Sequence, residues 1–343
     1  MANKRIYYAT QSVQLKPRLA SGDSWNNDQS YVTPRGLQSV GMTTNFNLTQ
    51  LFELGQQELY DNVEGVPEIQ VTLQKTLDGT IPLYLICMGG TLANGVNKNI
   101  GELANNRVDF KLGVYDDTDL AAVGSSTYGV ECSGMYLSSI GYTLPLDGFA
   151  TEDVTLVGNS KKWSNNTSNN GTWSESAPQT AKSAVRRLNV NIAGSTLPGD
   201  IPAGSHYQSI NVRANLGREA INELGQLAPY CRYVKFPLEV TSEFAISATE
   251  GDKKDADDYL TSGWGTCSSN KNLSDRTILI KICGTGGTSD SNNMEINLGT
   301  KNKLTSVNYT GGDTGGGNAT VTYSYQTFNF LKVNVAGTFA SVD

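Results

Sequence analysis

One long segment occurs twice in the chain, and this repeat limits the possible fold more than any other feature. The first copy, at 37–67, is LQSVGMTTNFNLTQLFELGQQELYDNVEGVP, and the second, at 207–237, is YQSINVRANLGREAINELGQLAPYCRYVKFP. They align without a gap at an offset of 170 (207 minus 37). Nine positions are identical, whereas ordinary residue frequencies would give roughly two. The repeat predicts that one structural unit is present twice.

The identical positions include a Leu-Gly pair, a tyrosine and a proline, which we interpret as duplicated structural positions: Leu54, Gly55, Tyr60 and Pro67 in the first copy, and Leu224, Gly225, Tyr230 and Pro237 in the second. Behind each proline, apolar and polar residues alternate, with Ile69, Val71 and Leu73 in the first copy and Val240, Phe244 and Ile246 in the second. This alternation predicts a half-buried strand in each copy.

A second match lies near the end of each half, LSSIGYT at 137–143 and LTSVNYT at 304–310. Its offset is 167 (304 minus 137), so one small net gap reconciles both matches. Helix is predicted to be scarce. The candidates are Leu92–Asn105 and Arg218–Leu227, and the counterpart of the latter, Thr49–Leu59, is expected to be a short helix or a loop.

These patterns predict a division of the 343 residues into five parts. Residues 1–36 form an N-terminal arm, 37–160 the first copy, 161–185 an Asn/Ser/Thr-rich linker or loop, 186–335 the second copy, and 336–343 a C-terminal tail.

Composition supports a β-rich chain and excludes several functions. Only 17% of residues are charged, while 36 glycines and 16 tyrosines are present, which is typical of strands joined by many turns. The net charge of −7 argues against a nucleic-acid-binding surface, although ordinary solubility explains that charge equally well. The five cysteines include no CxxC pair, so free thiols are expected. The N-terminus resembles no signal peptide, and no apolar run is long enough for a membrane span.

No catalytic constellation or cofactor motif is found, and we expect neither an enzyme nor a cofactor or metal site. The one histidine, His206, stands in a Gly/Ser/Pro-rich stretch without a nucleophile motif. The acidic cluster Asp116, Asp117 and Asp119 could bind calcium, but it lacks EF-hand spacing, and a solvated turn is the simpler interpretation.

A glycine-rich tract separates two strand-like segments near the C-terminus. It predicts a flexible turn, for which a long solvent-exposed loop is the simpler interpretation. We also regard its residues as candidate contacts between subunits or rings: Gly311, Gly312, Asp313, Gly315, Gly316, Gly317 and Asn318.

Two stretches resemble bacteriophage tail tube (major tail) proteins. One is ELGQLAPYCRYVKFPLEVTSEFAI at 223–246, where the family has a Leu-Gly, a Pro-Tyr and a proline followed by an E-V-T strand. The other is YLSSIGYTLPLDGFATEDVTLVGNSKKW at 136–163, which resembles the hairpin of the same family. The first copy departs at Leu59, which stands where the second has Pro229, and the second copy lacks the L-V-G-N ending.

The resemblance implies a mainly β chain with two tandem tail-tube-type β-sandwich domains, whose sheets join between subunits into a continuous β-barrel. It implies stacked rings, as trimers with pseudo-sixfold symmetry, that form a hollow tube in the virion tail after assembly in the host cytoplasm. Partners would be further copies of the chain and the terminator, tape measure and sheath proteins. Viral DNA would pass through an acidic lumen without specific binding, and no membrane is involved.

Two alternatives stay open. The chain could be another virion component of the same fold group, namely a tail terminator, a baseplate protein or a capsid decoration protein. It could instead be a carbohydrate-binding β-protein, using Trp163, Trp173 or Trp264 in polar loops.

Overall fold

The computed structural model describes residues 6–21, 24–26, 31–88, 99–115, 128–165, 184–249, 251, 273–283, 294–312, 314 and 317–335. This part of the chain is mainly β, with 55% of its residues in strands and 7% in helices, which confirms the predicted fold class at this level.

Strands follow one another with little helix between them. The elements are η1 (Tyr8–Thr10), β1 (Gln11–Ser21), β2 (Ser24–Asn26), β3 (Leu37–Asn45), β4 (Thr49–Phe52), β5 (Leu59–Val63), β6 (Glu68–Thr76), α1 (Leu83–Met88), α2 (Ile100–Leu103), β7 (Arg107–Val114), β8 (Tyr128–Pro145), β9 (Thr151–Gly158), β10 (Lys162–Asn165), η2 (Arg187–Asn189), β11 (His206–Asn215), β12 (Arg218–Ile221), β13 (Cys231–Val234), β14 (Glu239–Ser247), β15 (Leu279–Ile282), β16 (Met294–Asn297), β17 (Lys303–Thr310), β18 (Thr320–Phe328) and β19 (Lys332–Val335).

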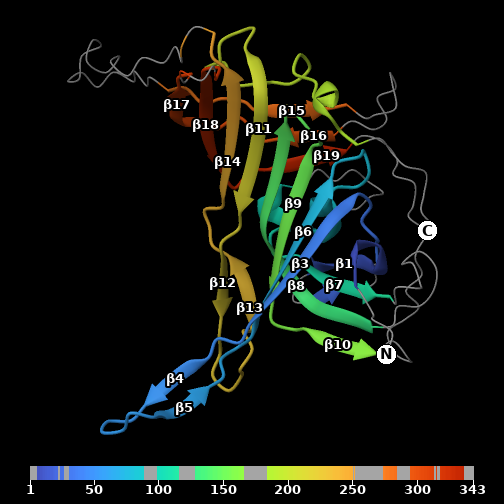
Figure 1. The fold of residues 1–343 in the computed structure, drawn as a ribbon, viewed down its shortest axis with the longest axis vertical. Helices are drawn as coiled ribbons and strands as arrows, with labels where there is room; N and C mark the ends of the chain where they lie inside the picture. The colour runs from blue at the N-terminus through green and yellow to red at the C-terminus, as the bar shows by residue number, and fades with distance from the viewer. Residues whose placement is uncertain are drawn as a thin grey trace.

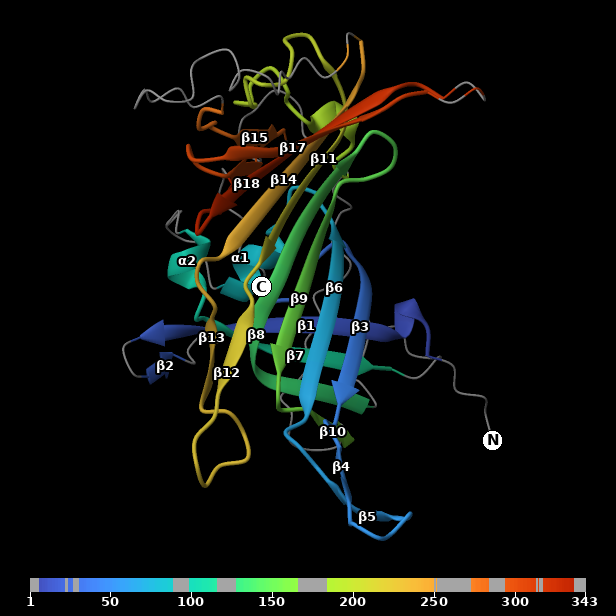
Figure 2. The same cartoon turned by 90° about the vertical axis from the view of Figure 1, so that its left-hand side faces the viewer.

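A long antiparallel sheet runs through the molecule in the order β3-β6-β9-β8-β11-β14-β18-β17 (Figures 1 and 2). Its first four strands come from the first half of the chain and its last four from the second half. The inward side chains of β6 and β14 are buried and the alternate ones are more exposed, as the sequence alternation predicts.

Strand β8 joins two groups of strands within one 12-stranded sheet, because it bends in the middle. Its first part pairs with β7 and β10, and its last part pairs with β9 and β11. At the bend Gly134 has φ +65°, and the Asp109 carboxylate accepts hydrogen bonds from the Gly134 amide (2.8 Å) and the Ser133 hydroxyl (3.1 Å). Arg18 of β1 pairs with Asp109 at 2.5 Å, so the corner is fixed from three strands.

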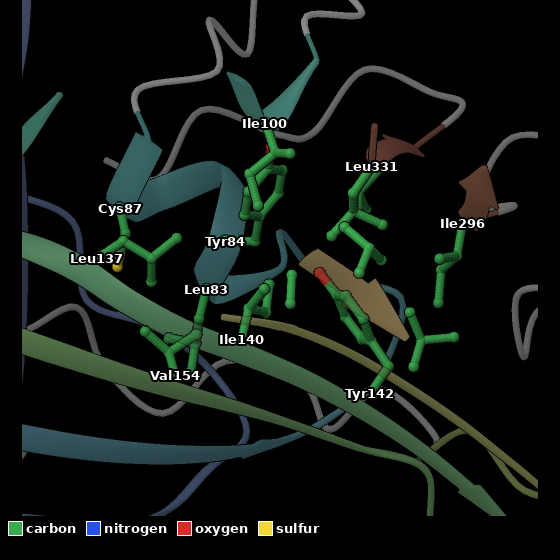
Figure 3. Packing of buried hydrophobic residues seen from close by; sticks show 14 of the residues in the cluster. Leu83, Tyr84, Cys87, Ile100, Leu137, Ile140, Tyr142, Val154, Ile296 and Leu331 are labelled. Carbon is green, nitrogen blue, oxygen red and sulfur yellow. The ribbon is translucent and has the colours of Figure 1, made fainter. Parts of the chain in front are cut away.

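Helix α1 lies over the core side of the long sheet (Figure 3). Leu83, Tyr84 and Cys87 are buried together with Leu137 and Val154 of β8 and β9. On the second half of the chain a small sheet, β15-β16-β19, contributes its buried residues to the same core cluster.

Buried polar groups fix the start of α1. The Glu152 carboxylate accepts the backbone amides of Leu83 (2.6 Å) and Tyr84 (2.9 Å) and the Tyr142 hydroxyl (2.9 Å). Burial raises the pKa of Glu152 and lowers the pKa of Lys75, and attraction between the two charges opposes both shifts. Lys75 also donates hydrogen bonds to the Thr80 hydroxyl and the Ile81 carbonyl (2.7 and 2.6 Å).

Several local predictions are corrected. Residues 11–21, part of the expected N-terminal arm without clear periodicity, form β1, which pairs with β7 and buries Val13 and Leu15. The helix expected at 218–227 and its counterpart at 49–59 are hairpins in which β12 pairs with β13 and β4 pairs with β5. Of the helix expected at 92–105, α2 covers only Ile100–Leu103, and residues 89–98 lie outside the described residues.

Candidate assembly interface

The two copies of the repeated segment have the same strand pairing. β3 pairs with β6, and β11 pairs with β14. Each pairing has a bulge near the start of its first strand, between Leu37 and Ser39 in β3 and between Tyr207 and Ser209 in β11. Their bulged residues make the same contact. Gln38 Nε2 donates to the Gly36 carbonyl (3.2 Å), and Gln208 Nε2 donates to the His206 carbonyl (3.3 Å).

The turn that leaves each of these strands is also repeated. Asn45 Oδ1 accepts the amide of Asn47, and Asn215 Oδ1 accepts the amide of Gly217, both at 3.1 Å. Asn47 and Gly217 both have positive φ, +50° and +45°. An asparagine side chain that accepts the amide two residues later is a common turn device, and Asn and Gly are the residues that best adopt this conformation.

Each copy then extends a hairpin beyond the end of the long sheet, β4–β5 in the first and β12–β13 in the second (Figure 1). The duplicated Leu-Gly pair forms the tip. Leu54 and Leu224 are fully exposed, and Gly55 and Gly225 have φ +92° and +87°. Tyr60 and Tyr230 are also exposed.

Pro67 and Pro237 each lie between a hairpin and the long strand that follows it, β6 in the first copy and β14 in the second. The second copy has one extra residue there, Leu238, so that Asn45 pairs with Glu68 while Asn215 pairs with Glu239.

The second sequence match occupies equivalent strand positions. β8 has a bulge between Leu137 and Ser139 in its pairing with β9, and β17 has one between Leu304 and Ser306 in its pairing with β18. The long sheet therefore consists of two four-stranded modules of identical order, β3-β6-β9-β8 and β11-β14-β18-β17.

The two modules meet where β8, the last strand of the first, pairs antiparallel with β11, the first strand of the second. This internal joint pairs Ser139 with Asn215 at one end and Pro145 with Ser209 at the other. The Leu216 amide extends it with a hydrogen bond to the Ser138 carbonyl (2.9 Å). Arg218 adds hydrogen bonds to the Leu137 and Ala104 carbonyls (2.7 and 2.6 Å).

The two outer edges of the long sheet are β3, the counterpart of β11, and β17, the counterpart of β8. Within the described residues, β3 pairs only with β6, and β17 pairs only with β18. Apolar side chains that are covered at the internal joint are open at these edges. Leu216 is fully buried, whereas its counterpart Phe46 is 59% exposed. An open edge with exposed apolar side chains favours pairing with another strand.

The face of the long sheet that points away from the core is almost entirely small and polar. Across it lie Ser39, Thr43, Gln70, Thr72, Thr155, Ser139, Thr143, Asn211, Thr241, Thr322, Ser324 and Asn308. Its acidic residues are Glu68, Asp153, Glu239 and Glu243, and its basic residues are Arg213 and Lys303. Two of these charges are already paired, Glu68 with Arg232 (3.7 Å) and Lys303 with Asp275 (2.9 Å). This face therefore has a weak negative charge. It has few side chains that could bind an apolar or anionic ligand.

The tract predicted as a flexible turn does connect β17 to β18, and Gly311, Gly312, Gly317 and Asn318 are exposed. Asp313, Gly315 and Gly316 lie outside the described residues, and contacts of this tract with other subunits stay a prediction.

The described residues contain no group of three or more His, Cys, Asp and Glu side chains that could hold a metal ion. His206 is the exposed first residue of β11. Trp163 is exposed on β10, whereas Asp116, Asp117, Asp119, Trp173 and Trp264 lie outside the described residues. No helix among the described residues is long and apolar enough to cross a membrane.

No protein-family model matches the chain, and no curated protein matches its sequence.

Proposed function

We propose that the chain is the tube-forming structural protein of a bacteriophage tail. The observation that carries the proposal is the internal joint, in which two like modules are already joined edge to edge while the same two edges are open at the ends of the sheet. A chain of this kind can add further chains by repeating a contact that it already makes. Such addition either continues as a filament or closes as a ring.

Ring closure by three chains gives a barrel of a plausible size. Eight strands per chain make 24 in a trimer. With strands about 4.8 Å apart and tilted by about 40°, the backbone diameter is roughly 48 Å, which leaves a lumen wider than a DNA duplex after side chains are added. Closure also removes both open strand edges.

In such a ring the small polar face of the sheet would line the lumen, because the core, α1 and the remaining sheets cover the opposite face. Its surplus of carboxylates would repel DNA phosphates, and its short side chains would offer few contacts. DNA would therefore pass without specific binding.

The projecting hairpins suit contact between successive rings. Both leave the same end of the long sheet, and both carry exposed apolar residues, among them Leu54, Tyr60, Leu224 and Tyr230. Head-to-tail stacking through such contacts does not close, and so it produces a tube.

Electron microscopy of the purified protein tests the proposal. We expect hollow tubes with a regular axial repeat, or rings with three copies of the chain. Isolated rings that never stack would favour a terminator, baseplate or decoration protein of the same fold group. A protein that stays monomeric at high concentration would refute the proposal, and glycan binding by such a monomer would favour the carbohydrate-binding alternative.

A further inference from the structure

We infer the residue register of the joint between chains: β17 of one chain pairs antiparallel with β3 of the next, with Thr43 opposite Asn308. Asn45 then lies opposite Ser306 and Gly41 opposite Thr310. The inference rests on the proposed ring, and it specifies which atoms meet in that ring.

The register follows from the internal joint and the two sequence offsets. There Gly141 of β8 is opposite Arg213 of β11. The first-copy counterpart of Arg213, 170 positions earlier in the sequence, is Thr43. The second-copy counterpart of Gly141, 167 positions later, is Asn308. The bulges support both offsets, because they fall at Leu137/Ser139 and Leu304/Ser306 and at Leu37/Ser39 and Tyr207/Ser209. A slip by one residue would turn every side chain to the wrong face.

Hydrogen bonding gives a second constraint. The Leu216 amide donates to the Ser138 carbonyl, which marks that pair as hydrogen-bonded. Antiparallel pairs alternate between hydrogen-bonded and non-hydrogen-bonded, so Gly141 and Arg213 form a non-hydrogen-bonded pair. By equivalence, the Phe46 amide would donate to the Thr305 carbonyl of the neighbouring chain. Thr43 and Asn308 of the neighbouring chain would form a non-hydrogen-bonded pair with closely spaced side chains.

Burial supports the same pairing. On the core side, the register places Met42 opposite Tyr309 and Thr44 opposite Val307 of the neighbouring chain. Their internal counterparts, Val212 with Tyr142 and Ala214 with Ile140, are all buried. The register thus covers the exposed Tyr309 and the half-buried Met42. It also places Val40 and Ser39 opposite Gly311 and Gly312, the first residues of the glycine-rich tract.

One contact of the internal joint has no equivalent between chains. Arg218, which donates to the Leu137 and Ala104 carbonyls, is replaced at the first-copy position by the exposed Leu48. Leu48 cannot donate those hydrogen bonds. The joint between chains therefore lacks a connection that the joint within the chain has.

A cysteine pair tests the register. In a background with Cys231, Cys267 and Cys283 changed to Ser, the double variant Thr43→Cys/Asn308→Cys is oxidised and run on a non-reducing gel. We expect a ladder that ends at the covalent trimer. The pair Gly141→Cys/Arg213→Cys is the matched positive control and should form a disulfide within one chain, since a Cβ at Gly141 meets only ordinary contacts (3.8 Å).

The off-register pair Thr43→Cys/Thr310→Cys is the negative control, because diagonal side chains are about 7–8 Å apart and a disulfide needs Cβ atoms about 4 Å apart. Microscopy of the same samples separates the two proposals. Rings in which this control cross-links and Thr43→Cys/Asn308→Cys does not would overturn the register and leave the tube function standing. Absence of rings and of any cross-link between chains would overturn both.

Discussion

Tyr142 and Tyr309 occupy the same position in the two modules, yet Tyr142 is 1% exposed and Tyr309 is 51% exposed. The difference comes from the neighbouring strand. β11 lies beside Tyr142 and pairs it with Val212, whereas no described strand lies on the outer side of β17. The exposure of these two tyrosines thus shows the same strand position with a neighbouring strand (Tyr142) and without one (Tyr309).

The same substitution at these two positions is expected to have opposite consequences. Tyr309→Asp should leave the monomer folded, within about 0.5 kcal/mol of the parent, because surface substitutions cost little. It should abolish rings and tubes, because a charge would be buried at the joint. Size-exclusion chromatography with light scattering measures the assembly state.

Tyr142→Asp should instead prevent stable folding, since it places a carboxylate in the core beside Glu152. Phe149→Asp, at a residue that is similarly exposed but lies outside β3 and β17, serves as the control and should still assemble. Normal rings from Tyr309→Asp would contradict the lateral joint.

Glu152 is expected to be a main determinant of stability. Glu152→Ala should lower the free energy of unfolding by about 3–5 kcal/mol, because it leaves two buried amides of α1 and the Tyr142 hydroxyl without their acceptor. It also removes one of the two carboxylates that attract the buried Lys75, so that only Asp78 (3.6 Å) remains. Asp153→Ala, on the opposite face of the same strand, should cost about 0.5 kcal/mol or less. Urea denaturation followed by circular dichroism measures both values, and equal costs would contradict the assigned role of Glu152.

The projecting hairpins should matter for tubes but not for folding. The double variant Leu54→Ser/Leu224→Ser changes two fully exposed tip residues, so the melting temperature should stay within a few degrees of the parent. Tubes should be replaced by single rings in electron micrographs, because apolar area at the stacking contact is lost. Tubes of normal length would show that the tips take no part in stacking.

Thiol chemistry should distinguish the core from the hairpins. Burial raises the pKa of Cys132 to about 11, so its thiol is protonated at pH 8. The same burial keeps the thiol out of reach of reagents. Cys231 begins β13 of a projecting hairpin and is partly exposed. In the folded monomer, maleimide should label Cys231 at pH 8 and reach Cys132 only after denaturation. Mass spectrometry of the labelled peptides measures this, and rapid labelling of folded Cys132 would contradict its burial.

Sequence reasoning was reliable where a pattern reports local structure. The alternation after Pro67 and Pro237 predicts the buried faces of β6 and β14, and the glycine-rich tract predicts the turn between β17 and β18. It failed for β4 and β12, where apolar residues have helix-like spacing but strands pair within an exposed hairpin. It also missed β1, because the residues that bury Val13 and Leu15 come from distant strands.

The repeated segments, the alternating strands and the low charge were determined by the sequence alone, since each is a property of residue order and residue type. Only the tertiary structure decided that β8 bends at Gly134 and changes its strand partners there, that it pairs with β11, and that β3 and β17 are left as open edges. Strand neighbours are chosen by contacts between residues far apart in the chain, and these contacts depend on how whole faces pack together rather than on any local pattern.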